Sequence, residues 1–310
     1  MLKLPSFAKI NWTLRIFGRR PDGYHEVATL LQSISLCDEL TFELRDDQEI
    51  ALTCDDPAIP IDKSNLVVQA ARALQNNDRG INISLTKRIP VKGGLGGGSS
   101  NAAVTLLALN QLWDLELQDT DLSRIAATLG ADVPFFLMGG SAEGRGTGTE
   151  LRPVADVEQK QLIVITPSAT VSTAVAYAAL NRGSLTTSDS ASILSSSFAG
   201  PVCGDSGQWS LHNDFEVAIF EIEPEIRRAK VALLEAGARG ALLAGSGSSV
   251  FGIFDDEAAR DRALVKLRSE TGWRVFSCRT LSRAEYLQAM GPSGFPLLRS
   301  LKNRQSDTGA

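Results

Sequence analysis

Residues 90–101 read Pro-Val-Lys-Gly-Gly-Leu-Gly-Gly-Gly-Ser-Ser-Asn, with five glycines in six positions. Glycine lets a backbone turn sharply and bring its N–H groups against an anion. The residues after this stretch, 101–113, carry apolar side chains at helical spacing. We therefore expect a helix that begins at Ser99 or Ser100 and directs the positive end of its dipole toward the glycines. This arrangement predicts a phosphate-binding loop.

Two common nucleotide-binding signatures do not fit this loop. The dinucleotide pattern G-x-G-x-x-G meets Ser99 or Asn101 where its last glycine should stand. The P-loop pattern fits residues 93–98 but has Ser99 in place of its lysine. A flexible linker is the alternative interpretation. The strand pattern before the glycines and the helix after them favour a binding loop, whose cation must come from elsewhere in the chain.

Composition excludes several classes of function. The chain has 310 residues, of which 43% are hydrophobic and 22% charged, as in globular proteins. A net charge of −5 with no dominant basic run argues against nucleic-acid binding. No apolar stretch approaches the roughly 18 to 20 residues of a membrane span, and no signal-peptide core precedes Asn11. Four scattered cysteines indicate reduced thiols, so we expect a cytoplasmic protein. A monomer or a homodimer is expected.

Hydrophobic periodicity predicts an α+β fold with helices on one face of a mainly antiparallel sheet. A polar stretch at 154–161 marks the expected domain boundary, and the serine-rich segment 183–210 is interpreted as a loop or insertion. Strands are expected at 2–17, 38–52, 81–85, 162–166, 240–244 and 250–254, with strand and turn over 139–148. Helices are expected at 64–74 with Ser64 as cap, 101–113, 119–129 with Gly130 as C-terminal cap, 223–236 and 257–270.

Three segments together resemble the motifs of the GHMP kinases, small-molecule kinases named for galactose, homoserine, mevalonate and phosphomevalonate. They are Ser6-Phe7-Ala8-Lys9-Ile10-Asn11, the loop 90–100, and Ala244-Gly245-Ser246-Gly247. The resemblance covers about residues 1–285. It implies a nucleotide-binding N-terminal domain at 1–157, a ferredoxin-like C-terminal domain at 158–290 and an active site between them. Residues 291–310 would form a disordered tail.

The resemblance also implies how ATP is held. The expected nucleotide-binding residues are Asn65, Lys87, Pro90, Val91, Lys92, Gly93, Gly94, Leu95, Gly96, Gly97, Gly98, Ser99, Ser100 and Asn101. No cage of metal ligands is visible, so Mg²⁺ on the ATP would be held mainly by phosphate oxygens and water.

Two residues match the family's catalytic pair, Lys9 and Asp132. By itself, Asp132 would be a turn residue or a helix cap, because it follows a helix-ending glycine. Phosphoryl transfer to an alcohol, however, needs an acceptor for the hydroxyl proton, and a carboxylate can serve. Lys9 would keep that carboxylate ionised and supply the cation that the loop lacks.

The segment Gly18-Arg19-Arg20-Pro21-Asp22-Gly23-Tyr24-His25 resembles the cytidine-binding motif of one branch of the family. That branch phosphorylates the 2-hydroxyl of a cytidine diphosphate-linked methylerythritol in isoprenoid precursor biosynthesis, with Tyr177 stacking on cytosine opposite Tyr24. His212, by contrast, is interpreted as an ordinary surface or core histidine. The expected substrate-binding residues are Asn11, Tyr24, His25, Thr173, Tyr177, Gly245, Ser246 and Gly247.

Two alternatives remain. Another GHMP kinase, for homoserine or mevalonate, would lack the Tyr24–His25 motif. A nucleotide sensor without turnover would have lost Lys9 or Asp132, and this chain has both. The chain departs from the family pattern at Trp12, where leucine is usual, and at Ala244, where serine is common. Trp12 is expected to reshape the floor of the site.

Overall fold

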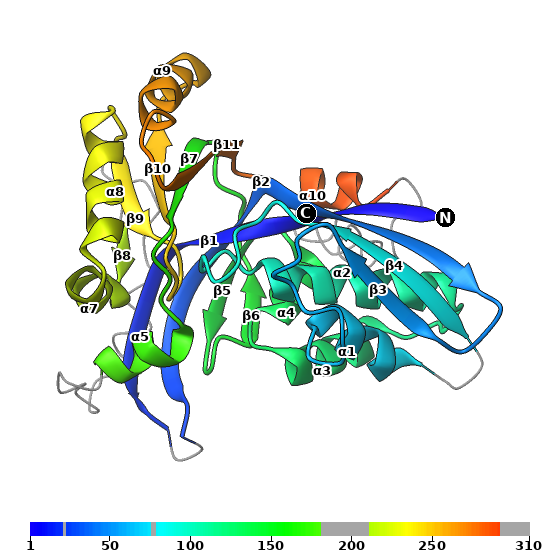
Figure 1. Cartoon of the computed structure of the whole chain (residues 1–310). Helices are drawn as coiled ribbons and strands as arrows, with labels where there is room; N and C mark the ends of the chain where they lie inside the picture. The colour runs from blue at the N-terminus through cyan, green and yellow to red at the C-terminus, as the bar shows by residue number, and fades with distance from the viewer. Residues whose placement is uncertain (21–22, 76–78, 181–210, 292–310) are drawn as a thin grey trace, which may run out of the picture.

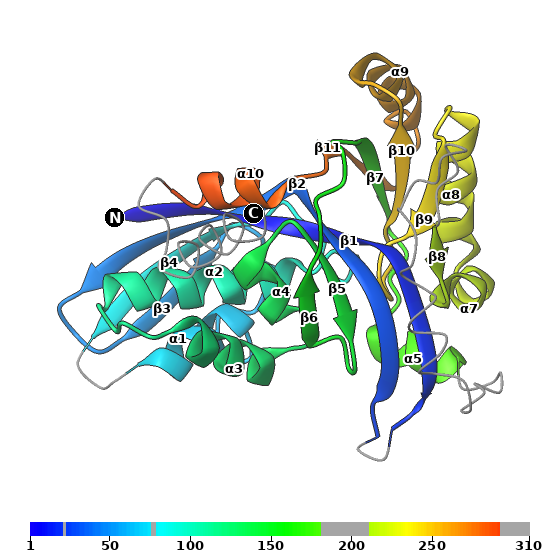
Figure 2. The same cartoon turned by 180° about the vertical axis from the view of Figure 1, so that it is seen from behind.

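The computed structural model describes residues 1–20, 23–75, 79–180 and 211–291. Figures 1 and 2 show two sheets with their helices, seen from opposite sides. The serine-rich segment 183–210 lies outside the described residues. Of the expected tail, 291–310, only Gly291 is described. No helix in the described ranges is both long and apolar enough to cross a membrane. Of the cysteines, Cys37, Cys54 and Cys278 are described, and all three are free thiols.

The larger sheet is built on a long antiparallel hairpin of β1 (Leu2–Arg19) and β2 (His25–Arg45). The sequence predicts these strands only at 2–17 and 38–52. The first half of β2 is buried along most of its length, so it lacks the alternation that marks a half-exposed strand. The strand order is β3-β4-β2-β1-β8, and the β5–β6 hairpin pairs with β2. The remaining strands are β3 (Ile50–Cys54), β4 (Gly80–Thr86), β5 (Ser141–Arg145), β6 (Glu150–Pro153) and β8 (His212–Asn213).

Four helices cover one side of this sheet. They are α1 (Leu66–Leu74), α2 (Gly97–Leu112), α3 (Asp119–Leu129) and α4 (Val133–Met138). Residues 100–110 of α2 are all buried, which is typical of a helix enclosed by protein on every side. The predicted caps are corrected at α1, where Asn65 and not Ser64 accepts the Val67 N–H. Gly130 does end α3, as predicted.

The smaller sheet is antiparallel, with the order β11-β7-β10-β9. Together with α8 and α9 its strands run β-α-β-β-α-β along the chain, the ferredoxin-like arrangement that was expected. Figure 1 shows α8 and α9 on the outer side of this sheet. Its elements are β7 (Gln161–Pro167), α5 (Thr173–Leu180), α7 (Phe215–Ile222), α8 (Pro224–Glu235), β9 (Gly240–Leu243), β10 (Val250–Phe254), α9 (Glu257–Leu267) and β11 (Trp273–Arg279).

A shared core joins the two sheets. Trp12 on β1 is fully buried there and meets Phe251 of β10 edge to face, with ring centroids 5.8 Å apart. Trp12 therefore belongs to the core between the sheets. It does not line either of the two cavities that Lys9 borders, contrary to the expectation that it shapes the floor of the site. Ala244 is buried in the same core. Both departures from the family pattern therefore lie in the packed interior.

The last helix, α10 (Arg283–Ala289), returns to the larger sheet. Tyr286, Leu287 and Met290 are buried in the core of that sheet and its helices. Both views draw α10 above the long strands and α1 and α3 below them (Figures 1 and 2). The chain thus contributes to the core of the larger sheet both before and after it forms the smaller sheet. A single boundary at 157/158 therefore stays a prediction.

Candidate active site

The glycine-rich loop runs from the end of β4 to the start of α2. Helix α2 begins at Gly97, two residues before Ser99 and three before Ser100, the two predicted starts, because Ser100 already donates its N–H to the Gly96 carbonyl, at 2.8 Å. Gly96 has a left-handed backbone, with φ of 71°, which favours glycine at this position. The first N–H groups of a helix have no partner within the helix, so those of α2 are available to an anion at the loop.

The third motif packs directly on this loop. A Cβ on Gly94 would lie 1.8 Å from the carbonyl oxygen of Ala244, and one on Gly247 would lie 2.2 Å from the Gly94 nitrogen. Ser249 N–H also donates to the Gly93 carbonyl at 3.1 Å. Glycine is required on both sides of this contact, because any side chain would force the two segments apart. The contact fixes the loop to the smaller sheet.

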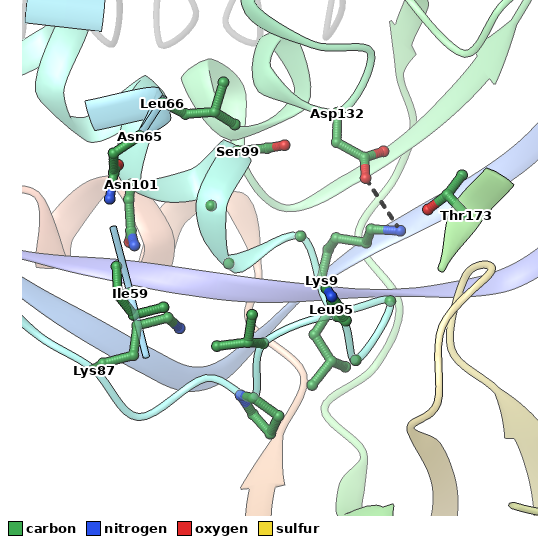
Figure 3. A pocket seen from close by; sticks show the side chains of 18 of the residues that line it. Lys9, Ile59, Asn65, Leu66, Lys87, Leu95, Ser99, Asn101, Asp132 and Thr173 are labelled. Atoms are coloured by element: carbon green, nitrogen blue, oxygen red, sulfur yellow. Dashed lines mark ion pairs between the residues drawn. The ribbon is translucent and has the colours of Figure 1, made fainter. Parts of the chain in front are cut away.

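Lys9 and Asp132 meet beside the loop. The Lys9 Nζ lies 3.5 Å from Asp132 Oδ2, with the Lys9 side chain 5% and the Asp132 side chain 40% exposed. Figure 3 shows them approaching each other from opposite sides, with Ser99 and Thr173 nearby. Lys9 Nζ also donates to Asn11 Oδ1 at 2.9 Å, and Asn11 Nδ2 donates to Thr29 Oγ1 at 2.7 Å. The lysine is therefore held in position by neighbours on β1 and β2, while the carboxylate faces open space.

A cavity of about 390 Å³ lies over the loop. Figure 3 shows Lys9, Asp132 and Thr173 at one end, Ser99 between the two ends, and Ile59, Asn65, Leu66, Lys87 and Asn101 at the other end. Its lining contains nearly all of the predicted nucleotide-binding residues, namely Asn65, Lys87, Pro90, Val91, Lys92, Gly93, Gly94, Leu95, Gly96, Gly97, Gly98, Ser99 and Asn101. Ser100 is the exception, because it is fully buried and its hydroxyl lies 2.7 Å from that of Ser6.

The polar side chains at the end of this cavity away from Lys9 already form hydrogen bonds within the protein. Asn65 caps α1 and donates to the Pro60 carbonyl at 2.7 Å. Lys87 Nζ donates to the buried carboxylate of Asp38 at 2.8 Å, and Asn101 Nδ2 donates to the same group at 3.1 Å. These polar groups therefore shape the cavity and its loop in addition to any contact with a nucleotide.

A second, larger cavity of about 1190 Å³ joins the first. Five residues line both: Lys9, Ser99, Asp132, Thr173 and Ser246. The predicted substrate residues Asn11, Tyr24, His25, Tyr177 and Gly245 line the second cavity. Gly247 lines neither, since it packs on the loop. A phosphate donor in the smaller cavity and an acceptor in the larger one would therefore meet at Lys9 and Asp132.

Part of the lining of the larger cavity is aromatic. His25 stacks on Tyr177 with ring centroids 4.9 Å apart, and Phe215 meets the Tyr177 ring edge to face at 5.0 Å. The resemblance places Tyr24 opposite Tyr177, but here the stacked ring is His25, while Tyr24 is 67% exposed. Burial, followed by the nearby charge of Asp132, raises the pKa of Tyr177.

Sequence reasoning gave no role to several residues that line the larger cavity. Arg19 and Arg20 belong to the segment that resembles the cytidine-binding motif, so the sequence could have indicated that they line this cavity. Phe215, at the start of α7, follows His212-Asn213-Asp214 and carries no signal of its own in the sequence. His212 itself contacts the Asp214 carboxylate and lines neither cavity.

Family comparisons agree with this geometry. The family model described as GHMP kinases N terminal domain matches residues 65–140, and that described as GHMP kinases C terminal matches residues 204–272. A 4-diphosphocytidyl-2-C-methyl-D-erythritol kinase of Syntrophus aciditrophicus is 41% identical over 284 residues, which cover 91% of this chain and 100% of the relative. One of Solibacter usitatus is 42% identical and covers 88% of this chain and 87% of the relative.

Solved structures extend the comparison. A crystal structure of 4-(cytidine 5'-diphospho)-2C-methyl-D-erythritol kinase has a TM-score of 0.73 and 34% identity, covering 90% of this chain and 99% of that one. A homoserine kinase from Cytophaga hutchinsonii has a TM-score of 0.66 at 23% identity, covering 90% of this chain and 95% of that one. The second likeness shows a common fold.

Proposed function

The chain belongs to the GHMP kinase family, and on that premise we propose that it phosphorylates the 2-hydroxyl of 4-diphosphocytidyl-2-C-methyl-D-erythritol with ATP, in isoprenoid precursor biosynthesis. Relatives of that name are about 40% identical over most of their length. The observation that carries the proposal is the Lys9–Asp132 pair at the junction of two cavities. Because ATP is the donor and the described cysteines are free thiols, we place this activity in the cytoplasm.

The smaller cavity suits ATP. Its loop offers backbone N–H groups and the start of α2 to the phosphates, while Ile59 and Leu66 at the other end offer apolar surface to a base. In this orientation the γ-phosphate would lie beside Lys9, since Lys9 stands at the end away from Ile59. The ammonium of Lys9 would offset the charge that spreads over the transferring group.

The larger cavity suits an acceptor with a base at one end. His25 and Tyr177 offer ring faces and Tyr24 a further aromatic surface, on which cytosine can stack. The alcohol end would then reach Asp132, and the diphosphate would lie between, along the same cavity as Arg19 and Arg20. This arrangement accounts for the Tyr24–His25 motif, which a homoserine or mevalonate kinase would not need.

The chemical step follows from these positions. The hydroxyl oxygen forms a bond to the γ-phosphorus while the bond from that phosphorus to the bridging oxygen breaks, and ADP leaves with the electron pair. The hydroxyl proton passes to the Asp132 carboxylate. Lys9 orients that carboxylate through the ion pair, and Asn11 holds Lys9 in turn.

The donor set also bears on Mg²⁺, which accompanies ATP in phosphoryl transfer generally. Among the described residues no group of three metal-ligating side chains occurs, and Asp132 is the one carboxylate that lines either cavity. Mg²⁺ usually keeps several waters and binds one or two carboxylates together with substrate phosphates. The site therefore fits Mg²⁺ held by phosphate oxygens, water and at most Asp132, where it would neutralise phosphate charge.

A coupled assay of ADP release tests the proposal. We expect rapid turnover with 4-diphosphocytidyl-2-C-methyl-D-erythritol and ATP, and background rates with mevalonate or homoserine. Turnover of mevalonate or homoserine instead would assign the chain to another activity of the family. ATP binding without turnover of any of the three would favour the non-catalytic nucleotide sensor.

A further inference from the structure

Asp38 is a fully buried carboxylate at the point where β2 and β4 separate. The last register pair of these strands joins Glu39 to Thr86. At the next position, hydrogen bonds to the Asp38 side chain replace the backbone hydrogen bonds between the two strands. Its Oδ1 accepts the N–H groups of Arg88 and Ile89, both at 2.7 Å. The carboxylate thus binds the residues at which the chain leaves β4 and enters the glycine-rich loop.

The other carboxylate oxygen of Asp38 binds the far end of the same loop. Its Oδ2 accepts from Asn101 Nδ2 on α2 at 3.1 Å and from Lys87 Nζ at 2.8 Å. Asn101 is fastened from the opposite side, where the Ser6 hydroxyl donates to its Oδ1 at 2.6 Å. A single buried group therefore connects the residue before the loop with the residue after it.

Lys87 is part of this connection. Its ammonium also donates to the Ile89 carbonyl, and a Cβ on Gly97 would lie 3.3 Å from the Nζ. The ammonium is thereby kept next to the first turn of α2. A buried ion pair is weak evidence for stability, because well-packed apolar side chains often stabilise a fold as much. All the donors to Asp38 come from segments that flank the loop or line the nucleotide cavity, which indicates a role in the geometry of the loop.

We propose that Asp38 is a positioning residue that holds the two ends of the loop 90–100 together and so prepares it for the phosphates of ATP. The inference rests on the proposed function in taking ATP as the ligand of the loop. A loop whose ends are fixed loses less conformational freedom when its N–H groups close on an anion. Asp38 acts through Arg88, Ile89, Lys87 and Asn101 without touching the nucleotide.

The test is Asp38→Asn. The amide keeps the size and one acceptor oxygen but cannot accept from both sides or balance Lys87. We expect the Kd for MgATP, measured by titration calorimetry, to rise about tenfold, the scale of one lost charge-assisted hydrogen bond. The Kd for the cytidyl alcohol and kcat at saturating ATP should stay within about twofold of the parent. Amide hydrogen exchange of residues 90–100 without nucleotide should speed up.

Glu216→Gln is the matched control. Glu216 also joins a lysine and a backbone N–H, those of Lys230 and Leu243, but it lies in the smaller sheet and lines neither cavity. The Glu216→Gln variant should have a lower melting temperature than the parent and an unchanged Kd for MgATP. Equal losses of affinity for both ligands in Asp38→Asn, or an unchanged Kd for MgATP, would overturn the proposal. The Kd for MgATP and the hydrogen exchange of residues 90–100 need neither turnover nor the acceptor, so these two readouts stand even if the proposed acceptor is wrong.

Asn101→Ala gives a second route if Asp38→Asn does not fold. It removes one donor at the exit of the loop, and the connection through Asp38 should then speed hydrogen exchange at the Arg88 and Ile89 amides at the entry. Unchanged exchange at those two amides would show that the ends are not coupled and would contradict the proposal. Where both variants fold, their effects on the Kd for MgATP should be less than additive.

Discussion

At the scale of single residues, Lys9 and Asp132 have complementary exposure. The Lys9 ammonium is buried, and a buried charge is costly unless it is paired and hydrogen-bonded. Asn11 and Asp132 supply those partners. The carboxylate of Asp132 is partly open, so it can meet an incoming hydroxyl. Removal of its charge should therefore affect the chemical step more than binding.

We expect Asp132→Asn to bind MgATP and the cytidyl alcohol with nearly the parent's affinities while turnover falls by roughly 10²-fold or more, the usual scale of general base catalysis. The amide keeps the size of the carboxylate and can still form hydrogen bonds, but it takes no proton. Calorimetry for both ligands and single-turnover formation of ADP provide the measurements. Asp121→Asn, which breaks a surface ion pair to Arg124, is the control and should be close to the parent. Turnover of Asp132→Asn within a few-fold of the parent would remove Asp132 from the chemistry.

At the scale of elements, Gly96 and Gly98 at the start of α2 have different structural roles. A Cβ on Gly96 would lie 2.6 Å from Phe136 and 3.1 Å from the Lys9 side chain, in a backbone conformation that disfavours other residues. A Cβ on Gly98 would meet only Leu66, at 3.7 Å, in ordinary contact. Gly96 is therefore needed for the fold, whereas Gly98 keeps the helix start open toward the cavity.

Two alanine substitutions separate these roles. Gly98→Ala should keep or slightly raise the melting temperature, because alanine favours a helix over glycine by about 1 kcal/mol. It should nevertheless raise the Kd for MgATP several-fold, since its methyl group enters the space over the helix start. Gly96→Ala should lower the melting temperature and the affinity together. If Gly98→Ala binds MgATP like the parent, the phosphates do not approach this turn.

The turn between β8 and α7 connects three parts of the molecule. Asn213 donates to the carbonyls of Leu243 and Gly245, at 2.9 and 2.7 Å, and so holds the third motif. Asp214 accepts the Ile16 N–H of β1 at 2.6 Å and contacts His212. Burial by itself would raise the pKa of Asp214, but hydrogen bonds from His212 and Ile16 bring it below its ordinary value. The carboxylate form is thus the one that the fold favours.

This pKa gives a pH dependence with a definite sign. A depressed folded-state pKa contributes stability above the unfolded value of about 3.9, and that contribution is lost as the pH falls through the folded value. We expect the melting temperature of Asp214→Asn to lie below that of the parent at pH 7. The difference between the two melting temperatures should become smaller below about pH 4. Melting temperatures of both proteins from pH 3 to 7 decide this. A difference that stays constant or widens in acid would show that the ionised carboxylate does not stabilise this turn.

At the scale of the whole molecule, the end of the described chain completes the core near its beginning. Tyr286 on α10 is fully buried, lies 5.4 Å from the Phe7 ring and donates its hydroxyl to the Phe136 carbonyl at 2.6 Å. Burial raises its pKa strongly, so the hydroxyl stays protonated as a donor. Phe136 lies in α4, which directly follows Asp132, so packing at α10 supports the helix beside the candidate active site.

Truncation of this side chain should weaken the larger sheet and its helices. We expect Tyr286→Ala to lower the free energy of unfolding by about 3–5 kcal/mol, the range for deleting a buried aromatic ring. Tyr286→Phe keeps the ring and loses one hydrogen bond, so it should cost only about 1 kcal/mol. Urea unfolding of both variants measures the difference. Equal and small losses would mean that α10 does not belong to this core.

The sequence by itself determined the local chemistry. Glycines at 93–98 predict a phosphate loop because only glycine allows such turns and approaches, and the order of three motifs predicts the family. Most helices, including the one that ends at Gly130, follow from periodicity and capping, which act over a few residues. Lys9 and Asp132 are predicted as a catalytic pair because they stand in segments that resemble family motifs.

Only the tertiary structure decided what depends on contacts between segments distant along the chain. It brought Gly247 onto Gly94, placed His25 on Tyr177, buried Trp12 between the sheets and returned α10 to the first core. It also showed Asp38 joining both ends of the loop, a role that no pattern around residue 38 indicates. Such contacts are fixed by close packing and by satisfying buried polar groups, and both depend on the whole fold.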